Sequence, residues 1–187
     1  MNFLIETSAR HIHLNQADLE TLFGEGYTLT HKKDLSQPGQ YACEERLSIV
    51  GEKSTIKNVV ILGPVRSDTQ VEVSASDART LGINAPVRES GHISNSGSCT
   101  LIGPKGELTI PKGVIIAKRH IHFNIKDAEK FGIQNKDVVK VKCGTNGRAL
   151  IFDDVICRVH ESFALAMHID TDEANACGGA TVGEIVK

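Results

Sequence analysis

Short apolar runs, many of them alternating with polar residues, recur along the chain and predict many short β-strands. The turn-rich pieces at 36–40 and 103–106 separate such runs, because Gly, Pro and Ser favour turns. The runs with strand character lie at 57–64, 85–90, 97–118, 137–143, 148–160 and 163–170. Helical stretches are short and few. This balance favours one or two β-barrels over a parallel α/β sheet.

Four related segments begin at His11, Gln70, His120 and Ala166. Each predicts a strand, a short helix and a glycine stop. The residue at the fifth position of each segment is of a type favoured as a helix N-cap. An acidic residue follows three positions later, as in a capping box. The predicted caps are Asn15, Ser74, Asn124 and Asp170. The acids are Asp18, Asp77, Asp127 and Glu173, and the stops are Gly24, Gly82, Gly132 and Gly178.

The third position of every segment carries a side chain that can bind a metal ion. These residues are His13, Glu72, His122 and His168. In two segments the first position is also a histidine, His11 or His120. Residues two apart on a strand share a face, so each of these segments presents two histidines side by side. Such histidine pairs suit zinc or a similar divalent ion. The alternative is a purely structural repeat with packed or solvated histidines.

The repeat pattern places the start of the second half of the chain near Lys118. Two similar halves, related by duplication, are therefore expected. Residues 25–44 have no counterpart in the later segments. They are expected to form an insertion, a short two-stranded flap.

Composition narrows the function classes. With 187 residues and 40% hydrophobic residues the chain can bury a sizeable core. A net charge of −2 and scarce aromatic residues argue against nucleic-acid binding. No apolar run approaches the ~20 residues that span a bilayer, and the N-terminus has no signal-peptide pattern. Five cysteines without a CxxC motif are expected to be reduced thiols. These features predict a cytoplasmic protein that binds neither membrane nor nucleic acid.

Two further segments are candidates for substrate binding. Arg66, four residues before a repeat segment, suits an anion because its fork pairs two oxygens of phosphate or carboxylate. A structural salt bridge is the alternative. Ser90 opens a Ser/Gly-rich stretch that could approach a ligand closely. Arg10 and Arg119 point away from the paired histidines and are expected to be scaffold. Since no Walker loop or GxGxxG is present, metal-assisted chemistry on an anionic substrate is the inference from the residues.

The motifs SARHIHL, GPVRSDTQVE and KRHIHF resemble the PduL-type phosphate acyltransferases, also called phosphate propanoyltransferases, and the resemblance covers essentially the whole chain. It implies two β-barrels capped by short helices, with the N-terminal strand completing the C-terminal barrel. The expected domains are 1–9 with 118–187, and 10–117. It also implies reversible acyl transfer between coenzyme A and phosphate, a link to microcompartment pathways of propanediol degradation, and a homodimer. Because only ten residues precede His11, an encapsulation helix is not expected, and the cytoplasm is favoured over a microcompartment lumen.

The resemblance also implies the site residues. Carried over by position, His11, His13 and Glu72 look like ligands of one zinc ion, which meets the coenzyme A sulfur. His120, His122 and His168 look like ligands of a second zinc ion. Arg66 looks like the phosphate-binding arginine, with Ser90 near it.

The hypothesis is direct attack of phosphate, held by Arg66 and the second metal, on the thioester carbonyl without a covalent acyl-enzyme. A zinc-dependent thioesterase or hydrolase is the competing enzyme. A metal-stabilised structural module is the competing non-enzyme.

Overall fold

The computed structural model describes residues 1–144 and 147–186. The chain divides into two compact units. Unit 1 contains Met1–Ala9, Ser36–Pro38 and the chain from Lys118 onward, and unit 2 contains Arg10–Leu35 and Gly39–Ala117.

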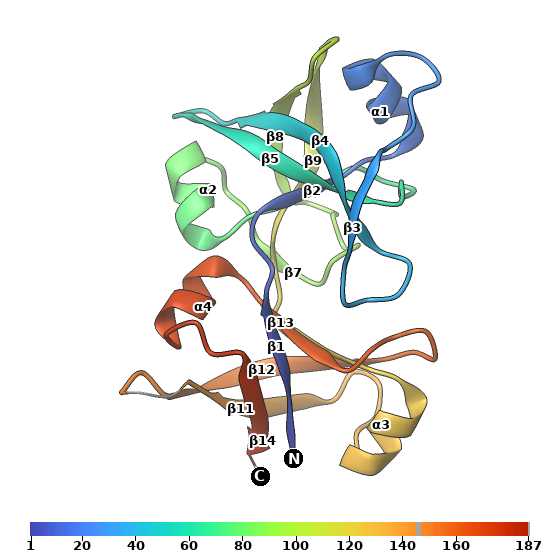
Figure 1. The fold of residues 1–187 in the computed structure, drawn as a ribbon. Helices are drawn as coiled ribbons and strands as arrows, with labels where there is room; N and C mark the ends of the chain where they lie inside the picture. Colours follow the sequence, from blue (N-terminus) through green and yellow to red (C-terminus); the bar gives the residue numbers. More distant parts are fainter. Residues whose placement is uncertain (145–146, 187) are drawn as a thin grey trace. The chain divides into compact units, whose positions relative to one another are not determined.

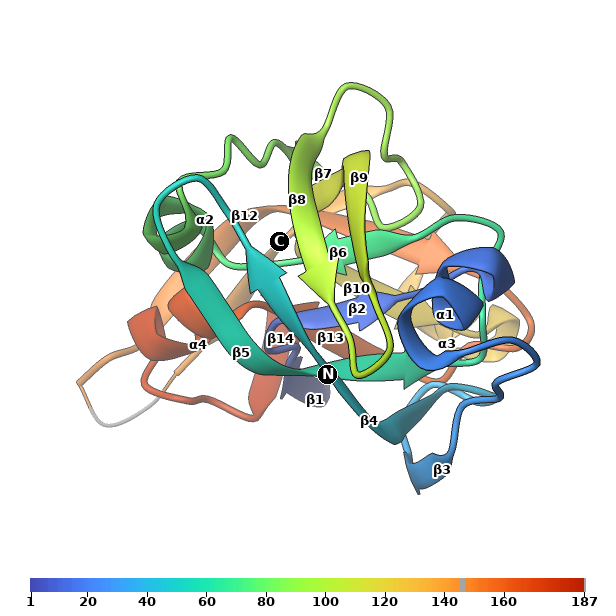
Figure 2. The same cartoon turned by 90° about the horizontal axis from the view of Figure 1, so that it is seen from above.

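Unit 2 is built on a closed ring of strands. The ring runs β4–β5–β2–β6–β9–β8 and returns to β4, while β3 and β7 pair outside it with β4 and β9. The helices α1 and α2 lie on opposite sides of this ring (Figure 1 and Figure 2). The elements are β2 (His11–His13), α1 (Gln16–Phe23), β3 (His31–Asp34), β4 (Tyr41–Val50), β5 (Thr55–Gly63), β6 (Gln70–Glu72), α2 (Ala75–Leu81), β7 (Val87–Arg88), β8 (Gly97–Ile102) and β9 (Glu107–Ala117).

Unit 1 is also a closed ring, in the order β1–β13–β10–β12–β11–β14. The N-terminal strand β1 therefore pairs with strands from the end of the chain, and α3 and α4 lie on opposite sides of the ring (Figure 1). The elements are β1 (Asn2–Thr7), β10 (His120–Phe123), α3 (Ile125–Phe131), β11 (Val138–Cys143), β12 (Leu150–Val159), β13 (Ala166–Ile169), α4 (Thr171–Ala176) and β14 (Val182–Val186).

The two rings share one pairing pattern. In each, the His-Ile-His strand pairs parallel with one strand and antiparallel with the strand of the next repeat segment: β2 with β5 and β6, β10 with β12 and β13. The latter strand pairs parallel with β9 in unit 2 and with β1 in unit 1. The expected mainly β fold of two barrels with short helices is confirmed. The internal duplication stays a prediction that this shared pattern supports.

The four helices begin where the sequence predicts. The side chains of the four predicted N-caps each accept a hydrogen bond from the backbone N–H of the acid three residues later. The predicted glycines end the first three helices, but α4 ends one residue early, with Cys177 as its C-cap. The Cys177 N–H bonds to the Glu173 carbonyl, and Gly178 follows with φ of 68°. The left-handed backbone conformation that glycine favours therefore occurs at Gly178, one residue after the C-cap.

Each unit has its own hydrophobic core. The core of unit 2 contains Ile12 and that of unit 1 contains Ile121, and both side chains are fully buried. All five cysteines are buried, and none forms a disulfide. Among the described residues, no helix is long and apolar enough to cross a membrane.

Candidate metal centres

The two His-Ile-His strands present their histidines on the face opposite the core. Side chains alternate along a strand, and Ile12 and Ile121 point into the cores. The two histidines that flank each isoleucine therefore point to the opposite face of the strand. The ring centroids lie 4.9 Å apart for His11 and His13, and 4.7 Å apart in the second strand. Each strand thus supplies two candidate ligands for a metal ion.

Strand register places a third candidate ligand beside each pair. Glu72 lies directly opposite His11 across the β2–β6 pair, and His168 lies opposite His120 across the β10–β13 pair. Residues opposite each other on antiparallel strands share a face. The ligand atoms of each set lie within 4.8 Å of one another. Donors around one tetrahedral zinc are about 3.4 Å apart, so small side-chain rotations would bring either set to coordination distance.

An arginine ties each His-Ile-His strand to the helix that follows the third ligand. In unit 2, Arg10 donates from Nε and Nη2 to the two carboxylate oxygens of Asp77, at 2.9 and 2.7 Å. In unit 1, Arg119 Nη1 donates to Glu173 at 2.8 Å. Both acids also cap their helices by accepting from the N-cap backbone. The arginines therefore act as scaffold that holds the ligand-bearing segments together.

The set in unit 2, His11, His13 and Glu72, is buried throughout. Burial alone would raise the pKa of Glu72, but His11 and His13 lower it well below its usual range. Burial, and after it the charges of His11 and Arg66, lowers the pKa of His13 well below its usual range. An ionised carboxylate beside a neutral imidazole is the protonation state that metal binding requires.

Hydrogen bonds leave the other imidazole nitrogens for a metal ion. His13 Nδ1 lies 3.3 Å from the Leu62 carbonyl, so it would donate there and leave Nε2 for a ligand. His120 Nδ1 makes the same kind of contact with the Lys118 carbonyl, at 2.9 Å. Such outer contacts commonly fix the tautomer of metal-binding histidines.

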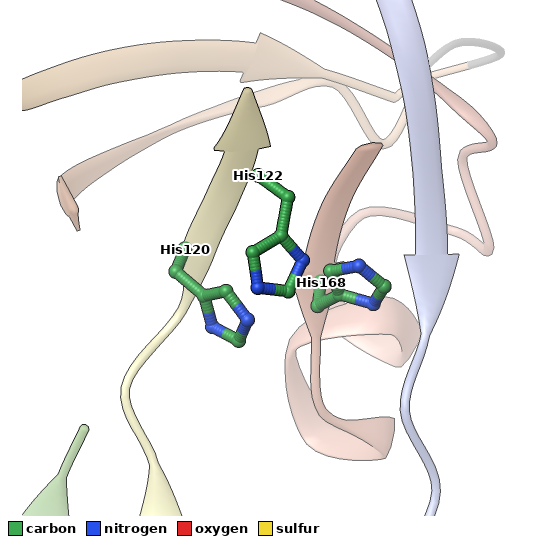
Figure 3. A group of neighbouring side chains, drawn as sticks. All are labelled: His120, His122 and His168. Atoms are coloured by element: carbon green, nitrogen blue, oxygen red, sulfur yellow. The ribbon is translucent and has the colours of Figure 1, made fainter. Parts of the chain in front are cut away.

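The set in unit 1 consists of three imidazoles that face one another (Figure 3). His120 and His168 are stacked with centroids 5.2 Å apart, and His122 lies 4.9 Å from His168. Burial, followed by the charges of His120 and His168, lowers the pKa of His122 to about 2. Its Nδ1 is buried and has no hydrogen-bond partner among the described residues. A buried polar atom without a partner is costly, and a metal ion would remove that cost if this nitrogen bound it. The donor set therefore fits zinc.

Arg66 and Ser90 lie beside the set in unit 2. Arg66 Nη1 donates to Ser90 Oγ at 3.3 Å, and Ser90 Oγ accepts from Gln70 Nε2 at 3.0 Å. The same Gln70 Nε2 donates to Glu72 Oε1 at 2.7 Å, while Gln70 Oε1 accepts from the Gly91 backbone at 2.7 Å. Polar contacts thus run without a break from Arg66 to the candidate ligand Glu72.

Gln70 is the residue of this network that the sequence argument missed. Its only signal in the sequence is its place in the repeat. Gln70 holds the first position of its segment, where the two His-Ile-His segments carry His11 and His120. It lies opposite His13 and is buried. His31, His92 and His160 are exposed and belong to neither set.

The family model for phosphate propanoyltransferase matches residues 4–180. The chain belongs to the phosphate propanoyltransferase family. It is 54% identical to a phosphate propanoyltransferase of Clostridioides difficile, over 98% of this chain and 88% of that protein. It is 57% identical to one of Thermotoga maritima, over 92% of this chain and 82% of that protein, and 53% identical to one of Listeria monocytogenes, over 98% and 86%. The family expected from the sequence is therefore confirmed.

Proposed function

We propose that this phosphate propanoyltransferase catalyses reversible transfer of a short acyl group between coenzyme A and inorganic phosphate, with one zinc ion in each histidine set. The names of the relatives support the reaction class. The observation that carries the proposal is the guanidinium of Arg66, which is linked to Glu72 through Ser90 and Gln70 and whose charge helps to lower the pKa of His13. An enzyme that uses phosphate needs such an anion site next to the reacting thioester, whereas a hydrolase that uses water does not.

Arg66 would bind the phosphate through its planar fork, which matches two phosphate oxygens. Ser90, in contact with Arg66 and Gln70, would hold the guanidinium in place. In the transfer, a phosphate oxygen forms a bond to the acyl carbon while the carbon–sulfur bond breaks and coenzyme A leaves as a thiolate. A bound zinc ion would supply a Lewis acid for the developing negative charge.

The cysteines support direct transfer without an acyl-enzyme. Burial raises the pKa of Cys43 to about 11 and those of Cys99, Cys143 and Cys157 to about 12. The thiolate is the nucleophilic form, so buried thiols with raised pKa values are poor candidates for a covalent intermediate.

Phosphate-dependent turnover tests the proposal. We expect coenzyme A release from acetyl-, propanoyl- and butanoyl-coenzyme A only when phosphate is present, with two zinc ions per chain by elemental analysis. A hydrogen bond to a charged group contributes about 1.5–3 kcal/mol. Arg66→Gln should therefore lower kcat/KM for phosphate by about 10- to 100-fold, whereas Arg88→Gln, at an exposed arginine of the same unit, should not. Equal thioester cleavage without phosphate would establish a hydrolase instead.

A further inference from the structure

The two candidate metal sets differ in where their carboxylate lies. In unit 2, Glu72 is itself one of the three ligand candidates. In unit 1, His168 occupies the equivalent register position, opposite the first histidine of the His-Ile-His strand. Three neutral imidazoles bring no charge to offset that of a divalent cation.

A carboxylate stands directly behind His168 on the neighbouring strand. Glu6 of β1 is the register partner of His168 in the parallel β1–β13 pair. Its Oε2 lies 3.7 Å from His168 Nδ1. The corresponding position in unit 2, the register partner of Glu72 on β9, is the apolar Ile115. Each set thus has one glutamate. In unit 2, Glu72 is itself a candidate ligand, whereas in unit 1, Glu6 lies on the strand next to the candidate ligand His168.

The Glu6 carboxylate is held in place from its other side. Ser36 Oγ donates a hydrogen bond to Glu6 Oε2. The next residue, Gln37, is buried and makes two hydrogen bonds with the backbone of Ala164, at 3.0 and 3.3 Å. The segment Ser36–Pro38 therefore fixes the glutamate, since Gln37 anchors the serine that contacts it.

We propose that Glu6 is a positioning residue for the metal ion of unit 1. A small side-chain rotation would close the 3.7 Å gap, so that Glu6 accepts a hydrogen bond from the Nδ1–H of His168. That bond fixes the tautomer that presents Nε2 to the metal, and the charge of Glu6 offsets that of the ion, as Glu72 would by direct contact in unit 2. A carboxylate behind a ligating histidine orients the ring and strengthens it as a ligand. This inference rests on the proposed function only in assuming that both sets hold zinc.

Zinc retention tests the inference without any activity measurement. Full-length protein loaded with zinc is titrated with a chromogenic chelator, for wild type, Glu6→Ala, Glu6→Gln and Ser36→Ala. Glu161→Ala is the matched control, because Glu161 is an exposed glutamate of the same unit. Loss of an outer-shell partner typically costs 10- to 100-fold in metal affinity. Glu6→Ala should therefore weaken one of the two zinc ions by about that factor, and Glu161→Ala neither.

Glu6→Gln and Ser36→Ala should weaken the same ion less. The glutamine amide oxygen can still accept a hydrogen bond from the Nδ1–H but carries no charge, and the serine variant keeps the carboxylate while loosening it. Repeating Glu6→Ala in a Glu72→Ala background assigns the affected ion. The zinc that this background still binds tightly belongs to unit 1, and it should lose affinity by the same factor.

Three results would overturn the inference. Both zinc affinities could be unchanged in Glu6→Ala, both could fall equally, or Glu161→Ala could match Glu6→Ala. Circular dichroism of each zinc-free variant identifies a general loss of folding, which would make Glu6 a structural residue only. Wild-type turnover with phosphate is measured separately. Its absence would reject the acyltransferase while leaving the zinc result on Glu6 intact.

Discussion

The contact between Arg10 and Asp77 should contribute measurably to the stability of unit 2. The guanidinium makes two parallel hydrogen bonds to the carboxylate, and Asp77 is 6% exposed. A hydrogen bond to a charged group contributes about 1.5–3 kcal/mol when buried, and exposed ion pairs contribute about 0.2–1 kcal/mol. Because the Arg10 side chain is 41% exposed, solvent screens the pair. A coupling free energy of about 1–2 kcal/mol is therefore expected.

A double-mutant cycle of Arg10→Ala and Asp77→Ala isolates this coupling. Asp77→Ala should be the more destabilising single variant, by about 1 kcal/mol, because it also removes the acceptor for the Ser74 N–H in the capping box. Urea unfolding in the presence of a chelator gives the free energies. The chain has two tyrosines and no tryptophan, and Tyr27 and Tyr41 both lie in unit 2. Tyrosine fluorescence therefore follows the unfolding of unit 2 alone.

The corresponding pair in unit 1 is the matched control. Arg119 makes a single bond to Glu173, and its other contacts are a hydrogen bond to the Asp153 carbonyl at 2.8 Å and the ring of Phe152 at 5.1 Å. Arg119→Ala should destabilise unit 1, but coupling to Glu173 should stay below about 1 kcal/mol, as followed by circular dichroism. Additive effects of Arg10→Ala and Asp77→Ala, with coupling under about 0.3 kcal/mol, would refute this account of the contact.

Three further predictions concern pH, thiols and glycines. Burial lowers the pKa of His122 to about 2 in the folded metal-free chain, against about 6.5 when unfolded. The unfolded chain therefore binds a proton that the folded chain does not, and stability present above pH 6.5 is lost as the pH falls. At pH 5.5 this loss is about 1.4 kcal/mol relative to pH 8, measured by urea unfolding with chelator; an equal pH dependence in His122→Gln would contradict it. The five buried cysteines should not react with a disulfide reagent in the native protein, and all five should react after denaturation; one rapidly modified native thiol would show otherwise. Gly51→Ala should cost about 3 kcal/mol or more in unfolding free energy, because an added Cβ would lie 2.1 Å from the Leu81 carbonyl oxygen. Gly132→Ala should cost only about 1–2 kcal/mol, since its φ is +66° but nothing lies within 4 Å; equal thermal shifts for the two variants would count against this reasoning.

The helix starts and the paired histidines could be predicted from the sequence because their physics is local. An N-cap side chain bonds to a backbone three residues away, so Asn15, Ser74, Asn124 and Asp170 are identifiable without any tertiary contact. Alternation along a strand likewise puts two histidines of a His-Ile-His strand on one face. The end of α4 was missed by one residue, because Cys177 and Gly178 can both stand near a helix terminus and local pattern does not choose between them.

The sequence by itself determined the mainly β class, the four repeat segments and the types of side chain at each position. Only the tertiary structure decided which strands become neighbours, because strand pairing joins residues far apart in the chain and depends on register. Register put Glu72 opposite His11 and His168 opposite His120. Folding also brought Ser90 to the side chain of Gln70, and the register of β1 on β13 put the N-terminal Glu6 behind His168. The only sequence signal of Gln70 is its first position in a repeat segment, and no local pattern marks Glu6. Their significance lies in the side chains that folding brings beside them.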